Sequence, residues 1–244
     1  MPKHVFFDLD NTLTPSRALM QTNHASLFER LCREREVVVV TGGEEAQIRK
    51  QIPVDPHGNF FMLSQQGNFA VHKNGSPLWH ETVTQQQEKA VRALGLKITQ
   101  EFAEREGVTP NMNDIFENRG SQFATSVLGF HASNEEKYAA DPDQSIRREL
   151  LLQHQEELAE LRKLGIEAMP AGTTTIDYIL VGKNKGFNIL RLIETVEWDR
   201  NSCIYFGDAL FKGGNDESVV GVITTQVVTD PNDTFRFIQE NLLS

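Results

Sequence analysis

The chain has 244 residues, of which 39% are hydrophobic, and its formal net charge is −10. This length suits one large domain or two modest ones, and the apolar content excludes wholesale disorder. It contains no long Lys/Arg block and no apolar run of membrane-spanning length, so neither nucleic-acid binding nor a membrane segment is expected.

The first part of the chain alternates predicted strands and helices. Strands are predicted at 4–7, 37–40 and 60–64. Helices are predicted at 17–35 and 44–51. Ser16 is expected to cap the first helix, and residues 68–75 indicate a hairpin. Because strand and helix alternate and the run 37–40 consists of valines, this part favours a buried parallel sheet.

The pattern changes near Thr82. Helices are predicted at 82–106 and 141–164, and strands at 114–117, 122–128, 166–169 and 174–181. Two long helices, each followed by two strands, are typical of an α+β domain with an antiparallel sheet. We therefore expect a separate domain inserted over residues 82–182.

The alternation of helix and strand resumes after the insertion. Helices are predicted at 185–195 and 232–242, and strands at 202–206 and 219–225. Asp230 or Pro231 is well suited to begin the last helix. Residues 1–81 and 183–244 are expected to form one α/β core domain with a Rossmann-like parallel sheet. We expect the inserted domain above the carboxyl edge of that sheet, where open α/β sheets bind ligands.

Two carboxylates follow the first strand. Asp8 and Asp10 are spaced i and i+2, so in an extended strand they point to the same side. Two like charges this close are costly unless a cation or a shared proton compensates them. Other strand ends and one helix start contribute Thr41, Asp208 and Lys185. Such an oxygen-rich, thiol-free cluster suits Mg²⁺, and a carboxylate nucleophile beside a second carboxylate suits phosphoryl transfer.

These motifs together resemble the haloacid dehalogenase (HAD) superfamily. They are Asp8-Leu9-Asp10-Asn11-Thr12, Thr41-Gly42, Lys185 and Gly207-Asp208, in this order. The resemblance covers essentially the whole chain. It implies an HAD core with an inserted α+β cap of the type found in Cof-like sugar phosphatases and phosphomannomutases. It also implies Mg²⁺ as cofactor and a small phosphorylated molecule as substrate.

The chain is more closely similar to eukaryotic-type phosphomannomutase. Leu13-Thr14-Pro15-Ser16-Arg17 resembles its Leu-Thr-Pro-Ala-Arg, and Thr175-Ile176-Asp177 resembles the Ser-Phe-Asp of its cap. Glu117-Asn118-Arg119-Gly120 resembles its Phe-Arg-Asn-Gly region. The gap between Gly207-Asp208 and Gly213-Gly214-Asn215-Asp216 is long, as in that family, whereas Cof-like phosphatases keep it much shorter.

The resemblance implies a role for each matching residue. Asp8 would be the nucleophile, Asp10 the general acid/base, and Lys185 the cation that neutralises the nucleophile and the transferring phosphoryl group. The implied metal ligands are Asp8, Asp208 and the backbone carbonyl of Asp10, with support from Asp216. The implied substrate and phosphate contacts are Arg17, Thr41, Gly42, Arg119, Lys137, Thr175, Asp177 and Asn215.

The chain departs from the phosphomannomutase pattern at three places. Phe130 stands where the mutase cap has an arginine, and Lys137 replaces a second arginine. Lysine keeps the charge but loses the bidentate fork that suits phosphate. Thr41-Gly42-Gly43 replaces Gly-Gly-Ser and looks like an ordinary HAD phosphatase. His131 or Arg147 are candidates to supply the missing phosphate contact.

We therefore expect a Mg²⁺-dependent phosphohydrolase that acts on a small phosphorylated metabolite, a sugar phosphate, through an aspartyl phosphate. A phosphomannomutase is one alternative, and a non-catalytic protein that binds a phosphorylated metabolite is another. A homodimer through the cap would match the phosphomannomutases and rests on that resemblance alone. Cys32 and Cys203 have no metal-binding spacing, and no signal peptide is evident, so a cytoplasmic protein is expected.

Overall fold

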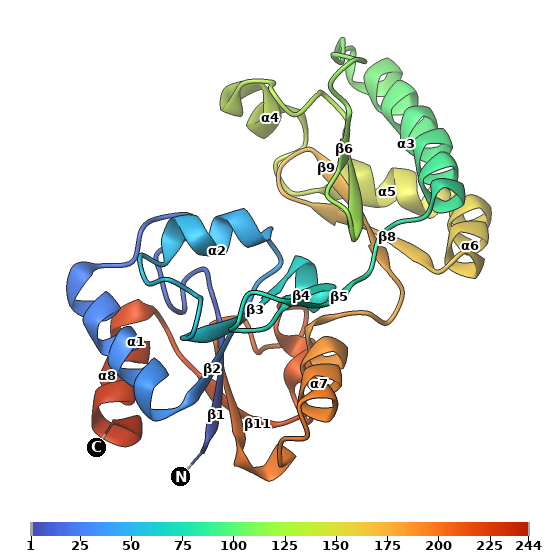
Figure 1. The fold of residues 1–244 in the computed structure, drawn as a ribbon. Helices are drawn as coiled ribbons and strands as arrows, with labels where there is room; N and C mark the ends of the chain where they lie inside the picture. Colours follow the sequence, from blue (N-terminus) through green and yellow to red (C-terminus); the bar gives the residue numbers. More distant parts are fainter. Residues whose placement is uncertain (1, 244) are drawn as a thin grey trace. The chain divides into compact units, whose positions relative to one another are not determined.

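The computed structural model describes residues 2–243, which fall into two compact units. The first unit comprises the chain up to His80 and from Gly182 onward, and the second comprises Glu81–Val181. Each unit has its own sheet and its own hydrophobic core (Figure 1). Among the described residues, no helix is both long and apolar enough to cross a membrane.

The first unit is built on a seven-stranded sheet with the order β11-β10-β1-β2-β3-β4-β5. The strands are β1 (His4–Asp8), β2 (Glu36–Val40), β3 (Phe60–Ser64), β4 (Phe69–Val71), β5 (Pro77–His80), β10 (Cys203–Gly207) and β11 (Thr224–Val227). The five strands from β11 to β3 are parallel, and β4 and β5 add an antiparallel edge. The predicted α/β class with a largely parallel sheet is confirmed.

Helices cover both faces of this sheet because its central strands are apolar on both sides. The helices and helical turns are α1 (Thr22–Glu34), α2 (Glu45–Gln51), η1 (Gln65–Gly67), α7 (Lys185–Thr195), η2 (Arg200–Ser202), η3 (Glu217–Val219), α8 (Pro231–Phe237) and the π-helical η4 (Ile238–Leu242). Val5 and Phe7 of β1 pack with residues of α1 and α8, and Phe6 packs with residues of α7 on the opposite face.

The predicted start of the first helix is wrong, whereas that of the last helix is confirmed. The first helix begins at Thr22 rather than at 17, its N-cap is Gln21, and the predicted cap at Ser16 is wrong. The preceding loop instead follows a tight path in which Arg17 has a positive φ of 55°. The last helix begins as predicted, because the Asp230 side chain accepts the N–H groups of Asn232 and Asp233 at 2.7 and 3.0 Å.

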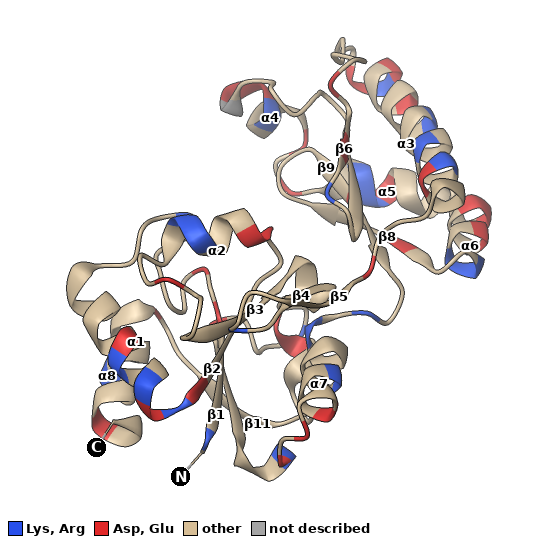
Figure 2. Ribbon diagram, in the orientation of Figure 1, with Lys and Arg blue, Asp and Glu red and all other residues tan. Residues whose placement is uncertain are grey.

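The second unit packs helices on one face of a four-stranded antiparallel sheet with the order β6-β7-β9-β8. Its strands are β6 (Phe116–Asn118), β7 (Gln122–Ser126), β8 (Ile166–Ala171) and β9 (Thr175–Leu180). Its helices are α3 (Gln85–Glu106), α4 (Asn134–Ala140), α5 (Ser145–Gln153) and α6 (Gln155–Lys163). Figure 2 shows Lys and Arg interspersed with Asp and Glu along α3 and α6, as expected of solvated helix faces.

The predicted continuous helix over 141–164 is wrong. The Asp141 carboxylate accepts the backbone N–H groups of Ile146 and Arg147 at 3.1 and 3.3 Å, and α5 therefore begins only at Ser145. The helix ends again at His154, whose φ and ψ of −102° and 33° depart from helical values. The preceding short helix α4, capped by Ser133, was not predicted.

Candidate active site

The candidate site lies at the carboxyl edge of the parallel sheet. Asp8 is the last residue of β1 and is only 3% exposed, because β1 lies between β2 and β10 in the middle of the sheet. Asp208 directly follows Gly207, the last residue of the neighbouring strand β10. Parallel strands end at the same edge, so the sheet itself brings these two carboxylates together.

Lys185 links two of the acidic residues. It is the first residue of α7 and is fully buried. Its Nζ donates hydrogen bonds to Asp8 Oδ1 at 2.5 Å and to Asp216 Oδ1 at 2.7 Å. A buried ammonium group needs such partners, and these two carboxylates supply them.

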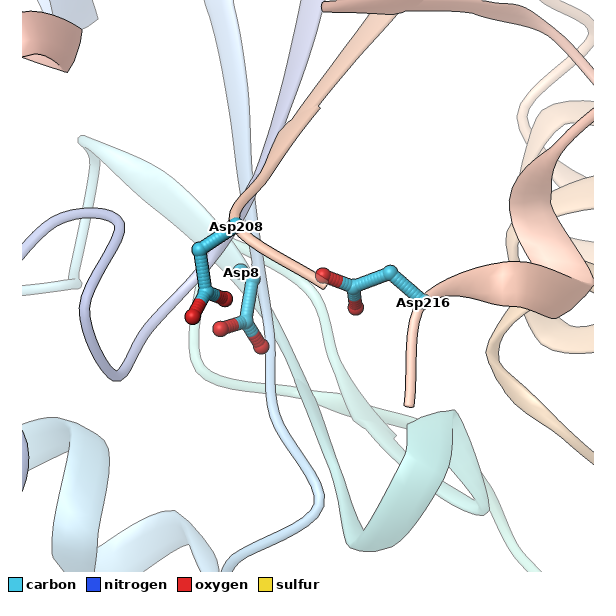
Figure 3. A group of neighbouring side chains, drawn as sticks. All are labelled: Asp8, Asp208 and Asp216. Atoms are coloured by element: carbon cyan, nitrogen blue, oxygen red, sulfur yellow. The ribbon is translucent and has the colours of Figure 1, made fainter. Parts of the chain in front are cut away.

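Asp216 completes a cluster of three carboxylates with Asp8 and Asp208 (Figure 3). One oxygen from each residue lies within 4.8 Å of the others. Tyr205 donates its hydroxyl to Asp216 Oδ1 at 2.6 Å. The other oxygen, Oδ2, is buried and has no hydrogen-bond partner in the described part of the chain. A buried carboxylate oxygen without a hydrogen-bond donor is suited to bind a cation.

The charges in this cluster are unbalanced. Burial, assisted by the charge of Asp216, raises the pKa of Asp8 to about 7 despite the opposing effect of Lys185. Burial and then Asp216 also raise the pKa of Asp208. Burial opposes the charge on Lys185, but Asp8 and Asp216 outweigh it and raise the pKa of that amine. One cation facing three carboxylates leaves a negative site made of oxygen ligands, which fits Mg²⁺.

The side chain of Asp10 lies outside this carboxylate cluster and faces α2. Its Oδ1 accepts the Arg17 backbone N–H at 2.7 Å and Gln51 Nε2 at 3.1 Å. Its Oδ2 accepts Gln47 Nε2 at 2.8 Å. The structure thus groups Asp8 and Asp208 with Asp216, whereas the expected metal contact of Asp10 is through its backbone carbonyl.

Thr41 and Gly42 follow β2 at the same edge of the sheet. Thr41 is 2% exposed, and its Oγ1 accepts the backbone N–H of Gly43 at 3.0 Å, which leaves the hydroxyl proton free to donate. The Thr41 backbone N–H donates to Leu63 O at 2.9 Å, so the turn is anchored to β3. This arrangement is compatible with the predicted phosphate contact.

Two buried asparagines join the segments that surround the cluster. Asn188 of α7 donates to Gln66 O at 3.0 Å and to Asn68 Oδ1 at 3.2 Å. Asn68 in turn donates to Lys183 O at 3.0 Å, two residues before Lys185. Because Gln66 N–H donates to Thr41 O at 2.9 Å, these amides tie the start of α7 to the Thr41 turn.

Arg17 and Asn215 are the exposed members of the predicted set. The Arg17 side chain is exposed, and its backbone N–H binds Asp10. Asn215 is exposed beside the fully buried Asp216.

The remaining predicted residues lie in the second unit. Arg119 pairs with Glu117 at 2.5 Å, approaches Asp177 Oδ1 at 3.7 Å, and lies 5.9 Å from the centroid of the Phe130 ring. Burial raises the pKa of Asp177 against the effect of Arg119. Lys137 donates to the backbone carbonyl of Phe130 at 2.6 Å.

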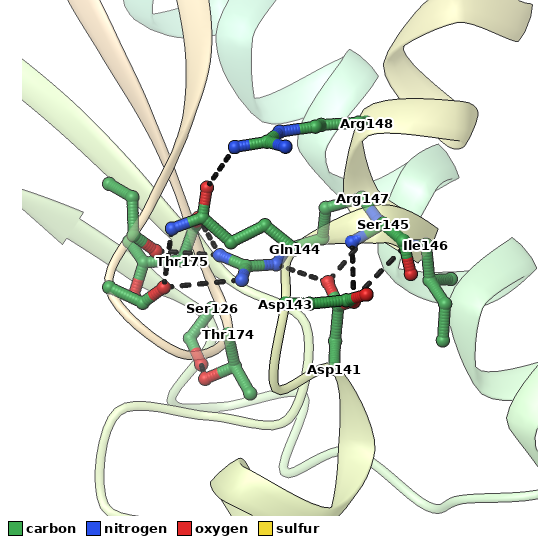
Figure 4. Close-up of polar contacts among 12 residues, drawn as sticks. Ser126, Asp141, Asp143, Gln144, Ser145, Ile146, Arg147, Arg148, Thr174 and Thr175 are labelled. Carbon is green, nitrogen blue, oxygen red and sulfur yellow. Dashed lines mark hydrogen bonds and ion pairs between the residues drawn. The ribbon is translucent and has the colours of Figure 1, made fainter. Parts of the chain in front are cut away.

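Thr175 begins β9 and is held through its backbone by Arg147 (Figure 4). The guanidinium of Arg147 is fully buried, pairs with Asp141 at 2.7 Å, and donates to the carbonyls of Ala171, Gly172 and Thr175 at 2.6, 3.2 and 2.5 Å. The guanidinium is thus paired with a carboxylate and with carbonyls inside the second unit, so Arg147 is not a substitute phosphate ligand. His131 is engaged by Asp114, with Nδ1 and Oδ1 at 2.9 Å.

Sequence reasoning missed several residues that contact Asp10 or the carboxylate cluster. Gln47 and Gln51 contact Asp10, and Tyr205 contacts Asp216. The two glutamines are four residues apart in a predicted helix, which places them on one face, so their spacing was a usable signal. Tyr205 lies in an apolar strand, and nothing in the sequence indicated that it contacts Asp216.

Comparisons with known proteins identify the family of this chain. The sequence model of the haloacid dehalogenase-like hydrolases matches residues 5–218. The chain belongs to this family. It is an enzyme of the haloacid dehalogenase kind, and the resemblance to this superfamily is confirmed.

Curated relatives in this family include phosphomannomutases. The chain is 24% identical to the phosphomannomutase of Encephalitozoon cuniculi, over 97% of this chain and 92% of the relative. It is 25% identical to phosphomannomutase 1 of Dictyostelium discoideum, over 96% and 94% of the two chains. The predicted likeness to phosphomannomutase is therefore confirmed.

Solved structures show the same fold. A haloacid dehalogenase-like hydrolase from Bacteroides thetaiotaomicron aligns with a TM-score of 0.63 at 14% identity, over 98% of this chain and 99% of the other. An N-terminally truncated IMP-nucleotidase of Plasmodium falciparum aligns with a TM-score of 0.66 at 14% identity, over 98% of this chain and 69% of the truncated one. At this identity the alignments establish the fold alone.

Proposed function

We propose that this family member is a Mg²⁺-dependent phosphohydrolase that acts on a sugar phosphate through an aspartyl phosphate on Asp8. The observation that carries the proposal is the buried contact of Lys185 with both Asp8 and Asp216, beside Asp208. In this contact a fixed cation lies next to the Asp8 carboxylate at the end of β1, which supports the proposed role of Asp8 as nucleophile. It would compensate the negative charge of a phosphoryl group as it transfers.

The proposed reaction has two steps. Asp8 attacks phosphorus, the phosphorus–oxygen bond to the sugar breaks, and Asp10 gives a proton to the leaving oxygen. Asp10 then takes a proton from water, which attacks the aspartyl phosphate, releases inorganic phosphate and restores Asp8. Thr41 and Gly42 bind phosphate oxygens in this proposal, and Lys185 neutralises them.

Asp8, Asp208 and Asp216 would hold the metal ion. The donor set consists of carboxylate oxygens alone, and Asp216 Oδ2, which has no hydrogen-bond partner among the described residues, is suited to bind the cation. A bound Mg²⁺ would supply positive charge that polarises the phosphoryl group.

The second unit is proposed to act as the cap that selects the leaving group, and its charges favour a phosphatase over a mutase. A mutase must bind the distal phosphate of a sugar bisphosphate. Here the charge of Arg119 is compensated by Glu117 and Asp177, and Lys137 donates to a backbone carbonyl. Phe130 adds no charge, so these residues offer a dianion no net positive potential. Thr175 and Asp177 are proposed to contact sugar hydroxyls instead.

Phosphomannomutase is the second candidate, because relatives of that name match nearly the whole chain. A panel of sugar phosphates, assayed with and without Mg²⁺ for phosphate release and beside a bisphosphate-primed mutase assay, separates the two functions. We expect Mg²⁺-dependent phosphate release that Asp8→Asn abolishes. Conversion of mannose 1-phosphate to mannose 6-phosphate faster than phosphate release would overturn the phosphatase proposal.

The same panel tests the third reading, a protein that binds phosphorylated metabolites without turnover. That reading requires tight binding with no Mg²⁺-dependent release from any substrate. The homodimer and the cytoplasmic location stay predictions, and sedimentation of the purified chain tests the first of them.

A further inference from the structure

The carboxylate of Asp10 is held by three donors from two segments of the first unit. The Arg17 backbone N–H and Gln51 Nε2 donate to Oδ1 at 2.7 and 3.1 Å, and Gln47 Nε2 donates to Oδ2 at 2.8 Å. A carboxylate has about four acceptor positions. The remaining position is therefore on Oδ2, which accepts one donor from the described part of the chain.

Helix α2 presents both glutamines to this carboxylate. Gln47 and Gln51 are one helical turn apart and face the same way. Ile48, between them, is buried in the core and fixes the helix against the sheet. Gln51 is 1% exposed, and its Nε2 also donates to Thr14 Oγ1 at 2.7 Å.

The Gln51 contact joins α2 to the loop that carries Asp10. Asn11 N–H donates to Thr14 O at 2.7 Å, and Asp10 and Thr14 form an isolated β-bridge. The loop is therefore closed on itself directly beside Gln51. A side chain that binds both Asp10 and Thr14 fixes the loop as well as the carboxylate.

The Thr41 turn makes room for Gln47. A β-carbon added at Gly43 would lie 1.9 Å from Gln47 Oε1, so a residue with a side chain would displace this amide. Gly43 N–H also donates to Thr41 Oγ1. The turn proposed to bind phosphate and the side chain that holds Asp10 are thus in direct contact.

We propose that Gln47 and Gln51 are positioning residues for Asp10 and that Asp10 exchanges protons through Oδ2. The inference rests on the proposed function, because it assigns a purpose to contacts around the proposed acid/base. The amides of both glutamines fix the direction of the carboxylate and, together with the Arg17 backbone N–H, occupy the other three acceptor positions. Without them, the Asp10 carboxylate loses the orientation that proton transfer requires.

The hydrolysis of p-nitrophenyl phosphate isolates this role. Because p-nitrophenolate leaves without a proton, formation of the aspartyl phosphate needs no acid, whereas its hydrolysis by water needs Asp10 as base. We expect Gln47→Ala to give a burst of about one p-nitrophenol per site, followed by turnover about tenfold to a hundredfold slower than in the wild type. Because only the second step slows, the KM is expected to fall together with kcat, and kcat/KM is expected to change little. Lys50→Ala, an exposed residue on the same helix, is the matched control.

A double-mutant cycle separates positioning from a general structural effect. If Gln47 acts through Asp10, Gln47→Ala adds nothing to the loss caused by Asp10→Asn. An equal loss in both backgrounds, or slower turnover without a burst, would overturn the inference. Gln51→Ala repeats the test at the second glutamine. Gln51 is buried, so this variant can fail to fold; Gln47 is partly exposed, and its variant is then sufficient for the test.

Failure of the proposed function has a different signature. Turnover that persists in Asp8→Asn would remove the aspartyl phosphate mechanism itself. Additive losses in the Gln47 cycle would leave that mechanism intact and remove only the positioning role.

Discussion

The backbone of Gly207 lies against the carboxylate of Asp216. A β-carbon added at Gly207 would lie 2.4 Å from Asp216 Oδ2, the buried oxygen that has no hydrogen-bond partner among the described residues. The end of β10 thus leaves space for a carboxylate that approaches from η3. This close approach is a condition for the three-carboxylate cluster to form.

Gly207→Ala should therefore impair the metal site specifically. The added methyl group would push the Asp216 carboxylate away from Asp8 and Asp208, so we expect Mg²⁺ to bind about tenfold or more weakly, as for other changes around metal ligands. The increase in melting temperature caused by Mg²⁺ measures this binding.

Gly95→Ala is the control for this prediction. It introduces a comparable clash, 2.5 Å from Thr125 Oγ1, but inside the second unit. It should lower stability while leaving the response to Mg²⁺ unchanged. An unchanged Mg²⁺ response in Gly207→Ala would show that Asp216 is not a ligand.

Asp8→Asn should become more stable relative to the wild type as the pH rises, when both are measured in EDTA. The pKa of Asp8 is about 7 in the folded protein, against 3.8 for an ordinary aspartate. A raised pKa of this kind contributes stability that is present below about pH 4 and is lost as the pH rises through about 7. Asparagine has no such loss, so the difference in melting temperature should grow over this window.

Mg²⁺ should reduce that difference, because the cation stabilises the ionised carboxylate of the wild type. Thermal unfolding at several pH values, with Mg²⁺ or EDTA, measures both effects. Parallel melting curves for the two proteins from about pH 4 to about pH 8 would contradict the raised pKa of Asp8.

Arg147→Leu should destabilise the protein by about 3–5 kcal/mol, because it leaves the buried Asp141 carboxylate unpaired. The pair lies at 2.7 Å, and both side chains are fully buried. Equilibrium unfolding by denaturant measures the loss. A much smaller loss of unfolding free energy would mean that other groups donate to the Asp141 carboxylate in the variant. Arg148→Leu, an exposed neighbour on the same helix, is the control.

Phe130→Arg should improve binding of a sugar bisphosphate. The set formed by Glu117, Asp177, Arg119 and Lys137 carries no net charge, and the change would add one positive charge beside Arg119. One added charge-assisted contact is expected to lower the inhibition constant of hexose 1,6-bisphosphate about tenfold. Phe130→Leu is the control, and equal inhibition of both variants would remove Phe130 as a determinant of substrate class.

Apolar runs in the sequence determined the central sheet of the first unit. The segments 4–7, 37–40 and 60–64, and residues 203–206 of the predicted segment 202–206, lie within strands that are largely buried on both faces, and a parallel sheet follows from that burial. A polar residue just after such a run must emerge at the carboxyl edge. The amino-acid sequence alone was therefore sufficient to predict that Asp8 and Asp208 lie at one edge of the sheet.

Only the tertiary structure decided where the polar side chains point. Asp10 was expected to aim at the same spot as Asp8, yet its side chain lies outside the three-carboxylate cluster and is held by donors on α2 and by the Arg17 backbone. The charge of Lys137 predicted a phosphate contact, but its ammonium group donates to a backbone carbonyl. The periodicity of a sequence determines which residues are buried. The direction of a polar side chain depends instead on donors and acceptors brought in from distant segments, and only the packed fold supplies these.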